Sequence, residues 1–389
     1  MLVSIWMYSY SMGVASARAI ERMMAYEPGL RWLTADQEVN HHSLSDFRVG
    51  HQEALDELFA QMLAMLETAG VVNLKRLLQD GTKVRAVAGS SSMHRRKTLE
   101  KRLREGRRVI RKLDEEAKNE EGMDARKQAA QQRAAREAVE RATAALEKLK
   151  KLEEKTKEKE KKELRVSESE AEARKMKHAD GSWAPSYNVQ ITTEEQSRMV
   201  VSVDVSSDAN DTQQLLPAIE RVNQMTGARP EQIIADNGYA TRKNVEGTAV
   251  QGIELIAPWK EDKSREAGAC RRNGIGEAFV PSAFGMKRGG KSMECPAGKQ
   301  LVRIGERVHH GVVKEIYQAE ARECGRCRYR KECCGARSGP RRLERVKETG
   351  AMRAYLGRMK QRVVKAVYSK RSEIAEFPHL WAKGVKKWR

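Results

Sequence analysis

Apolar residues in the first 70 positions recur at the three- and four-residue steps of a helix. The pattern predicts two helices, over residues 2–24 and 43–70. We expect Ser45 and Asp46 to cap the second helix and Gly70 to end it. One face of this helix carries five apolar side chains, namely Leu55, Leu58, Phe59, Met62 and Leu66. The opening residues are apolar but lack the positive start of a signal peptide, which favours a core helix.

The pattern changes after residue 73. Small and apolar residues alternate with Lys83 and Arg85, which predicts a strand, and Asp80 stands before a Gly-Thr pair typical of a turn. Residues 99–174 are dominated by Glu, Lys, Arg and Ala and predict two helical arms on either side of residues 119–123. A solvated helical hairpin or coiled-coil arm is the main interpretation. Direct DNA contact by this arm is the alternative, weakened by its many glutamates.

Strand and helix patterns alternate between residues 186 and 260. Residues 186–195 and 197–207 are rich in Val, Ile and Thr, and both predict strands. Asp211 stands in capping position before a helix that Gly227 ends. A short apolar strand then ends at Asp236, and a further helix begins near Arg242. This order predicts a mixed α/β sheet covered by helices.

Charge narrows the choice of partner. The 389 residues carry a formal net charge of +20, and 33% of them are charged, which favours an anionic partner such as nucleic acid. Residues 341–389 contain 15 Lys and Arg against four Glu, a surplus of 11. No run of about 18 apolar residues occurs, so we expect no membrane span and a cytoplasmic protein. The cysteines should then be thiols or metal ligands rather than disulfides.

Three acids stand out by their positions. Asp80 and Asp236 each follow an apolar run, and Glu376 lies in the basic C-terminal segment. Together they could hold two divalent ions against a phosphate, and all-oxygen ligation favours Mg²⁺. The alternative is that both aspartates are turn formers before Gly and Asn-Gly.

The C-terminal segment predicts one basic helix. Tyr368, Arg371, Glu376 and Lys383 lie within a sector of roughly 140° at about 100° per residue. Such a face could place a metal ligand between cations that hold phosphates, although a surface set of ion pairs is the alternative. Pro378 should end or kink this helix just after Phe377.

The six cysteines form a second candidate site. Cys324 and Cys327 make a CxxC pair, Cys295 precedes them, and Cys333 follows. Four such thiols suit a structural, tetrahedral Zn²⁺ in a zinc-ribbon-like region, with a hairpin over residues 303–320. Cys334 could replace Cys333, and Cys270 has no evident partner. Buried or incidental thiols are the alternative.

These motifs together resemble the bacterial insertion-sequence DDE transposases, in the group named after insertion sequence 1182. The resemblance is carried by QDGTKVRAVA, by the run from WAPSYNVQITTEE to TQQLLPAIE, by IIADNGYATRKN, and by the C-terminal Tyr, Arg, Glu and Lys. It implies a ribonuclease-H-like catalytic core in which Asp80, Asp236 and Glu376 bind two Mg²⁺ ions, for which Mn²⁺ can substitute. It also implies that Tyr368, Arg371 and Lys383 contact the phosphates at the transposon end.

The implied function is transposition. Such a protein binds double-stranded DNA at the element ends and at the target, cleaves strands with its metal ions and transfers them, commonly as a homodimer on the bacterial nucleoid. Family members usually extend beyond both ends of this sequence and often have proline where Phe377 stands, so we expect truncation at both ends. The alternative function is that of an inactive, truncated transposase relic that only binds DNA.

The sequence therefore predicts an α/β protein in six regions. They are an N-terminal helical domain (1–72), a first catalytic strand region (73–98), a charged helical-hairpin insertion (99–178), the continued catalytic core (179–260), a Cys-rich zinc-ribbon-like insertion (261–340) and a basic C-terminal helical region (341–389).

Overall fold

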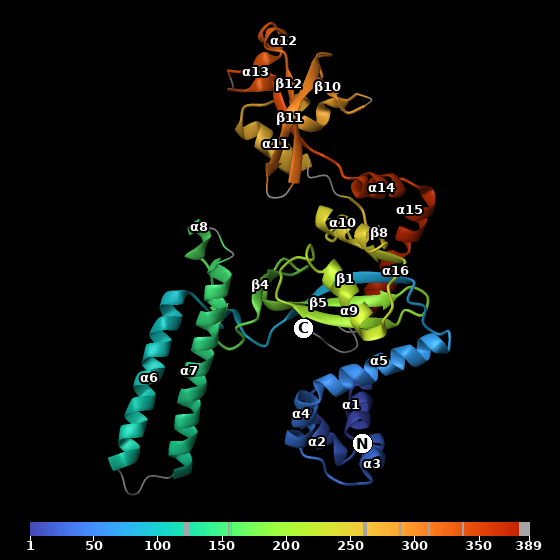
Figure 1. The fold of residues 1–389 in the computed structure, drawn as a ribbon. Coiled ribbons are helices and arrows are strands. Elements are labelled where there is room, and N and C mark those ends of the chain that lie inside the picture. Colours follow the sequence, from blue (N-terminus) through green and yellow to red (C-terminus); the bar gives the residue numbers. More distant parts are fainter. Residues whose placement is uncertain are drawn as a thin grey trace. The chain divides into compact units, whose positions relative to one another are not determined.

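The computed structural model describes residues 1–119, 125–154, 156, 158–259, 263–287, 289–309, 312–336 and 338–380. Contacts within the chain divide it into two compact units (Figure 1). Unit 1 comprises Met1–Ala257 with Arg362–Arg389, and unit 2 comprises Pro258–Gln361. Each unit has its own hydrophobic core.

The N-terminal region is helical, as the apolar spacing predicts, but it is more divided than expected. Its helices are α1 (Leu2–Ser11), α2 (Ala17–Met24), α3 (Pro28–Thr34), α4 (His41–Gly50) and α5 (Gln52–Thr68). The single helix expected over residues 2–24 is wrong, because Gly13 adopts a left-handed φ of 79° and Ser16 caps a new helix through the Ala19 amide. Ile5, Trp6, Ile20, Leu30 and Leu44 form the shared core.

The second expected helix is also two helices. Asn40, not Ser45 or Asp46, caps α4 by accepting from the Ser43 amide at 3.0 Å. Helix α5 ends as expected beside Gly70, whose φ is +71°. Phe59 and Leu66 of the predicted face pack inward beside the buried Leu63, which the prediction missed, whereas Leu58 and Met62 are exposed. This correction follows from the core, in which Leu63 meets Leu77, Val201 and Val222.

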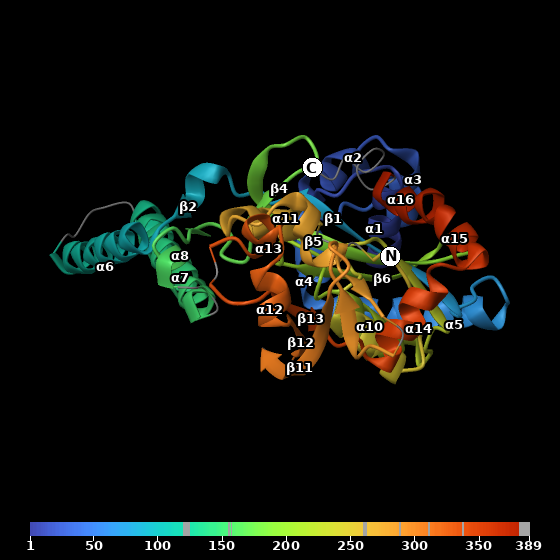
Figure 2. The ribbon, with the colours of Figure 1, turned by 90° about the horizontal axis from the view of Figure 1, so that it is seen from above.

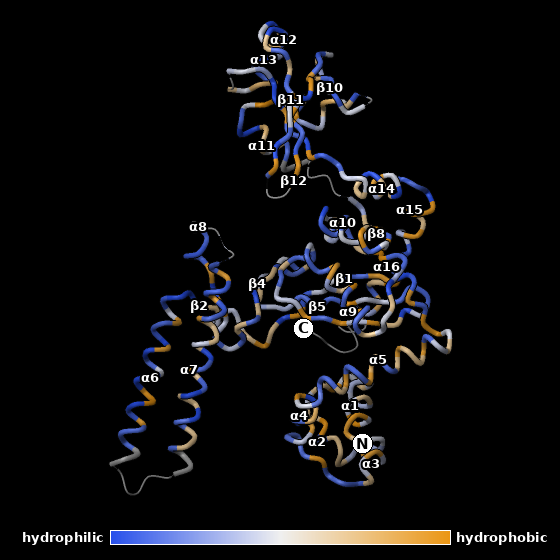
Figure 3. Tube along the Cα trace, in the orientation of Figure 1, coloured by the Kyte–Doolittle hydropathy of each residue, from blue (hydrophilic) through white to orange (hydrophobic). Residues whose placement is uncertain are grey.

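The charged region forms the expected pair of long helices. They are α6 (Arg96–Asn119) and α7 (Ala125–Glu154), which lie side by side in both ribbon views (Figures 1 and 2). Leu99, Ala145, Leu149 and Val166 make a narrow apolar seam at their base. Elsewhere the two helices are mostly hydrophilic (Figure 3). The smaller elements around them are η1 (Ser90–Ser92), β2 (Met93–His94), α8 (Glu158–Lys161) and β3 (Val166–Ser167).

A six-stranded mixed sheet is the centre of unit 1. Its strands are β1 (Arg76–Arg85), β4 (Arg174–Lys177), β5 (Trp183–Glu194), β6 (Val200–Ser206), β7 (Gln232–Ala235) and β8 (Glu254–Ile256). The order is β4-β5-β1-β7-β8, and β6 also pairs with β5. Strands β5 and β1 are antiparallel, whereas β1, β7 and β8 run parallel. The predicted mixed α/β architecture is therefore confirmed.

Two further pairs of helices belong to unit 1. Helices α9 (Leu215–Thr226) and α10 (Arg242–Val250) connect β6, β7 and β8. Helices α15 (Arg362–Ser369) and α16 (Arg371–Leu380) return from unit 2, and α16 packs on β1 and β5. The single C-terminal helix expected from the sequence is therefore wrong, because Tyr368 lies on α15 and Arg371 begins α16. The expectation that Pro378 ends the helix is wrong, because α16 continues through this buried proline to Leu380, the last residue that the structure describes.

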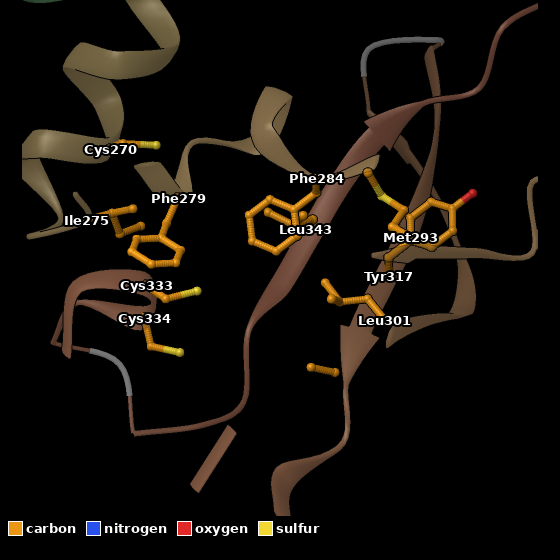
Figure 4. Close-up of a cluster of buried hydrophobic side chains, with 11 residues drawn as sticks. Cys270, Ile275, Phe279, Phe284, Met293, Leu301, Tyr317, Cys333, Cys334 and Leu343 are labelled. Atoms are coloured by element: carbon orange, nitrogen blue, oxygen red, sulfur yellow. The ribbon is translucent and has the colours of Figure 1, made fainter. Parts of the chain in front are cut away.

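Unit 2 is built on a five-stranded antiparallel sheet. Its strands are β9 (Gly285–Met286), β10 (Ser292–Glu294), β11 (Gln300–His309), β12 (Val312–Ala319) and β13 (Arg342–Val346), in the order β13-β12-β11-β10-β9. The hairpin predicted over residues 303–320 is β11 with β12. Its helical elements are α11 (Lys263–Arg272), η2 (Glu277–Phe279), η3 (Pro281–Ala283), α12 (Ala321–Gly325), α13 (Arg330–Cys334) and α14 (Gly350–Arg358). Figure 4 shows its core, where aromatic rings and cysteines meet.

No helix in the described part of the chain is long and apolar enough to cross a membrane.

Candidate active site

Asp80 lies inside β1 rather than at a turn. The strand continues through Gly81 and Thr82 to Arg85, with Asp80 in register with Ile191 of β5. The interpretation of Asp80 as a turn former is therefore wrong. The central position of β1, between β5 and β7, extends the strand across the Gly-Thr pair.

Asp236 follows the strand that runs parallel beside β1. The last paired residues of β1 and β7 are Gln79 and Ala235, so the two aspartates are the next residue on each strand. Adjacent parallel strands present such positions at the same edge of their pairing. The Gly238 amide donates to Asp236 Oδ1 at 2.7 Å, which fixes the carboxylate beside the turn.

The electrostatics of Asp236 show that the acids lie near one another. Burial raises the pKa of Asp236 above its ordinary value, and the negative charges of Asp80 and Asp211 raise it further. The Gly238 amide and the Arg371 guanidinium lower this pKa, but they do not cancel the rise. Folding therefore makes ionisation of Asp236 less favourable than that of an aspartate in the unfolded chain, and added positive charge would offset this cost.

Helix α16 delivers two nitrogen-bearing side chains to Asp80. One terminal nitrogen of Arg371 lies 2.9 Å from Asp80 Oδ1, and His379 Nε2 lies 3.4 Å from Asp80 Oδ2. All three side chains are more than four-fifths buried. The Arg371 ion pair brings the C-terminal helix and the first aspartate strand together, although they are almost 300 residues apart in sequence.

The remaining residues of the predicted C-terminal set lie in different environments. Tyr368 is half-buried near the acids, and burial is the main reason that its pKa is raised, with Asp236 and Asp80 adding to the rise. Glu376 is exposed, because α16 turns Ile374, Ala375 and Pro378 toward the protein instead. Lys383 lies outside the described residues.

A metal-binding group is not already assembled. Among the described residues, no three His, Cys, Asp or Glu side chains are arranged to hold a metal ion. The structure thus brings Asp80, Asp236, Arg371 and Tyr368 together and leaves Glu376 on the exposed face of α16.

Asp211 is the acid that sequence reasoning assigned to a cap. Gln214, not Asp211, occupies the N-cap of α9. The Asp211 carboxylate instead accepts from the side-chain amides of Asn188 at 2.8 Å and Gln190 at 2.7 Å. A Cβ atom at Gly81 would lie 2.5 Å from Asp211 Oδ1, so glycine is required for this carboxylate to approach β1.

A buried polar network supports the same strands. Gln190 Oε1 accepts from the Tyr239 hydroxyl at 2.6 Å and from the Gln79 amide at 2.9 Å, while Thr192 donates to Gln79 Oε1 at 2.7 Å. Burial raises the pKa of Tyr239, which keeps it a neutral donor. A signal for this network exists in the sequence, because Asn188, Gln190 and Thr192 alternate with apolar residues along β5.

Comparison with known families decides the identity. Residues 160–374 match the family described as the transposase DDE domain, which is more than half of the chain. The chain belongs to the transposase DDE domain family. The comparisons with curated proteins and with solved structures found no match.

The matched part of this DDE transposase includes Asp236 and Arg371. It begins after Asp80 and ends before Glu376, so the family match does not cover either of those two acids. The family is one of nuclease and transposase enzymes, whose members generally bind DNA and use divalent metal ions.

The cysteines of the transposase lie in unit 2, away from these aspartates in sequence and in fold unit. All six are free thiols. A small cavity is lined by five of them, Cys295, Cys324, Cys327, Cys333 and Cys334. The sixth, Cys270, packs in the hydrophobic core with Ile275 and Phe279 (Figure 4).

Proposed function

We propose that this chain catalyses metal-dependent cleavage and transfer of DNA strands at the ends of a bacterial insertion sequence. The observation that carries the proposal is the pairing of Asp80 and Asp236, each one residue beyond the last paired position of two parallel strands, with their charges acting on each other. We assign the sheet to a ribonuclease-H-like core, which the resemblance and the central position of β1 and β7 support.

The two aspartates have the chemistry to hold divalent magnesium. Carboxylate oxygens are the ligands that Mg²⁺ prefers. The pKa of Asp236 is raised mainly by burial, so a divalent cation would offset the cost of its ionised form. Metal bound there supplies Lewis-acid activation of the attacking and leaving oxygens. We assign Glu376 as the third ligand of the two ions because of the resemblance, and not because of its contacts. The resemblance also implies that Mn²⁺ can substitute for Mg²⁺.

The neighbouring cation and phenol suit a phosphate. Arg371 uses one terminal nitrogen on Asp80, and its Nε has no hydrogen-bond partner among the described residues. A guanidinium binds phosphate oxygens through parallel N–H donors. We assign to Arg371, Tyr368 and Lys383 the contacts that hold the transposon-end phosphate beside the two aspartates, in a homodimer on double-stranded DNA.

The test is strand cleavage by the purified full chain on a supercoiled plasmid that carries its coding region with the native flanking DNA. We expect nicking in Mg²⁺ and none in EDTA. The change Asp236→Asn should lower nicking by about 10³-fold or more, the scale of removing one member of a catalytic group, while salt-sensitive DNA binding persists in a mobility-shift assay.

Asp180→Asn is the matched control. Asp180 is an exposed aspartate in the β4–β5 connection that pairs with Arg85, so its loss should leave nicking unchanged. DNA binding without nicking at any Mg²⁺ or Mn²⁺ concentration would instead identify the chain as an inactive relic. Nicking by Asp236→Asn at the wild-type rate would show that the metal assignment is wrong.

A further inference from the structure

The cysteine cavity of unit 2 gathers thiols from two separate parts of the chain. Cys295 follows β10 in the tight turn to β11, whereas Cys324 lies on α12, Cys327 follows it, and Cys333 lies on α13. The cavity that they line has a volume of about 20 Å³. A space of this size holds a single water-sized body.

Backbone amides are directed at two of the sulfur atoms. The Lys299 amide donates to Cys295 Sγ at 3.2 Å, and the Arg341 amide donates to Cys324 Sγ at 3.4 Å. A neutral thiol is a weak acceptor, and a hydrogen bond to an ionised acceptor is about twice as strong as a neutral one. The two amides therefore hold these sulfur atoms in place as acceptors, which is how a bound thiolate ligand would also be held.

Positive charge gathers at the cavity, and one of its sources, the Arg341 guanidinium, is buried. Arg341 is only 4% exposed and lines the cavity. One of its terminal nitrogens donates to the Phe279 carbonyl at 2.9 Å, but its Nε has no hydrogen-bond partner among the described residues. Lys299 and Arg330 line the same cavity, but Lys299 forms an ion pair with Glu323 at 2.6 Å and Arg330 donates to the Ser338 carbonyl at 2.6 Å. A buried guanidinium is costly unless an anion pairs with it, and ligand thiolates would supply that anion.

Cys333 lies close to other thiols of the cavity. Burial raises the pKa of Cys333 to about 12, and the charges of Cys334, Cys324 and Cys295 add to the rise. The same interactions place Cys333 near both Cys295 and Cys324. Coordination would deprotonate the thiols outright.

We propose that Cys295, Cys324, Cys327 and Cys333 of unit 2 bind one structural Zn²⁺ ion in this cavity. Four thiolates are a tetrahedral set typical of zinc, and the cavity is too small for an iron–sulfur cluster. The side chains line the cavity without yet forming a metal-binding group, so zinc binding requires them to rotate toward its centre. Buried Arg341 then balances part of the negative charge of the site.

The role of the ion is to connect two halves of unit 2. Zinc would tie the β10–β11 turn to the segment of α12 and α13, which carries little other core: Cys333 and Cys334 are its buried side chains. Because ligand sites of this kind form only in the folded state, the binding free energy stabilises the fold of unit 2.

The test is the metal content of the full chain, purified without added metal and measured by inductively coupled plasma mass spectrometry. We expect about one zinc per chain, since structural zinc sites bind one ion per four ligands. The changes Cys324→Ser and Cys333→Ser should each remove it. The matched controls Cys270→Ser and Cys334→Ser, which change buried cysteines of the same unit, should keep it.

A second measurement uses only the wild-type protein and so does not depend on the folding of a variant. X-ray absorption at the zinc edge should show four sulfur neighbours at about 2.3 Å. Less than about half an equivalent of zinc, iron in its place, or a shell dominated by nitrogen and oxygen would each overturn the proposal. Loss of zinc from Cys334→Ser with retention in Cys333→Ser would overturn the ligand assignment. None of these readouts depends on DNA cleavage, so they stand apart from the proposed activity.

Discussion

Two sites in this protein bury groups that are harder to ionise than in water. One is the aspartate site of unit 1, which consists of Asp80, Asp236, Asp211 and Arg371. The other is the cysteine cavity of unit 2. Burial is the largest cause of the raised pKa at Asp236 and at Cys333 alike. In unit 1 an arginine from a distant helix forms an ion pair with an acid. In unit 2 the buried Arg341 donates to a backbone carbonyl, and its Nε has no hydrogen-bond partner within the described part of the chain.

This difference indicates which kind of ion each site suits. Oxygen ligands on a rigid sheet, next to a cation that also suits phosphate, are typical of a site where metal and substrate exchange. Sulfur ligands in a small enclosed cavity are typical of a permanent structural ion. The two proposals therefore predict opposite metal preferences in two parts of one chain.

The largest expected effect comes from exchanging the donor chemistry of the aspartate site. Asp236→Cys should lower Mg²⁺-dependent nicking by about 10³-fold or more, because a thiolate is a poor ligand for Mg²⁺. Mn²⁺ should restore part of the activity, since it accepts softer ligands than Mg²⁺ does. The measurement is the rate of plasmid nicking in each metal.

Asp236→Ala is the control for this metal exchange, because it lacks a donor and should be inactive in both metals. Equal recovery of Asp236→Cys and Asp236→Ala in Mn²⁺ would contradict direct ligation by residue 236. The reciprocal change, Cys324→Asp in unit 2, should lower the zinc content while nicking by the aspartate site keeps its preference for Mg²⁺.

The sequence was sufficient for the parts of the fold that depend on local patterns. The alternation along β5 and β6, the apolar run before Asp236 and the β11–β12 hairpin all predicted strands that the structure contains. The positions of Asp80 and Pro378 were misjudged for one reason. Both carry strong local signals for a turn or a break. Pairing of β1 with β5 and β7 overrides the signal at Asp80, and Pro378 is buried within α16, which continues through it.

The site could be predicted only in part, because its geometry depends on long-range pairing. Asp236 and Arg371 are identifiable by motif, but the contact of Arg371 with Asp80 depends on how α16 packs against β1. Asp211 looked like a helix cap, and only the pairing of β1 with β5 brings Asn188 and Gln190 to its carboxylate. The role of Glu376 stays a prediction, as does that of Lys383.

Filling the space beside Asp211 should lower the stability of the fold, which is an effect of intermediate size. A Cβ at Gly81 would lie 2.5 Å from Asp211 Oδ1 and 2.6 Å from Gln190 Nε2, so Gly81→Ala must displace a buried polar network. We expect a loss of about 1–3 kcal/mol in the free energy of unfolding, the usual cost of overpacking. Urea denaturation monitored by circular dichroism measures it.

Gly50→Ala is the matched control for this substitution. Gly50 has nothing within 4 Å of its added Cβ and lies at the end of α4 in the same unit, so the change should leave stability within about 0.5 kcal/mol. Equal stability of Gly81→Ala and Gly50→Ala would show that Asp211 does not need its position against β1.

The smallest expected effect is the dependence of stability on pH in the absence of metal. The folded chain raises the pKa of Asp236, so the stability that this residue contributes is present below the ordinary pKa of aspartate and is lost as the pH rises through the folded value. Asp236→Asn avoids this loss. In EDTA near pH 8 its Tm should exceed that of the wild type by a few degrees, and the excess should disappear near pH 4.

Asp180→Asn should change the pH dependence of stability in the opposite direction, which makes it a useful comparison. Hydrogen bonds from Ser182 lower the pKa of Asp180, so its contribution is present at neutral pH and is lost as the pH falls through the folded value. Its replacement should leave the Tm near pH 8 equal to or slightly below that of the wild type.

Addition of Mg²⁺ should then raise the Tm of the wild type and of Asp180→Asn but not that of Asp236→Asn, because a ligand stabilises only the folded chain that binds it. A Tm of Asp236→Asn below that of the wild type in EDTA would contradict the inference that burial and neighbouring acids make ionised Asp236 unfavourable.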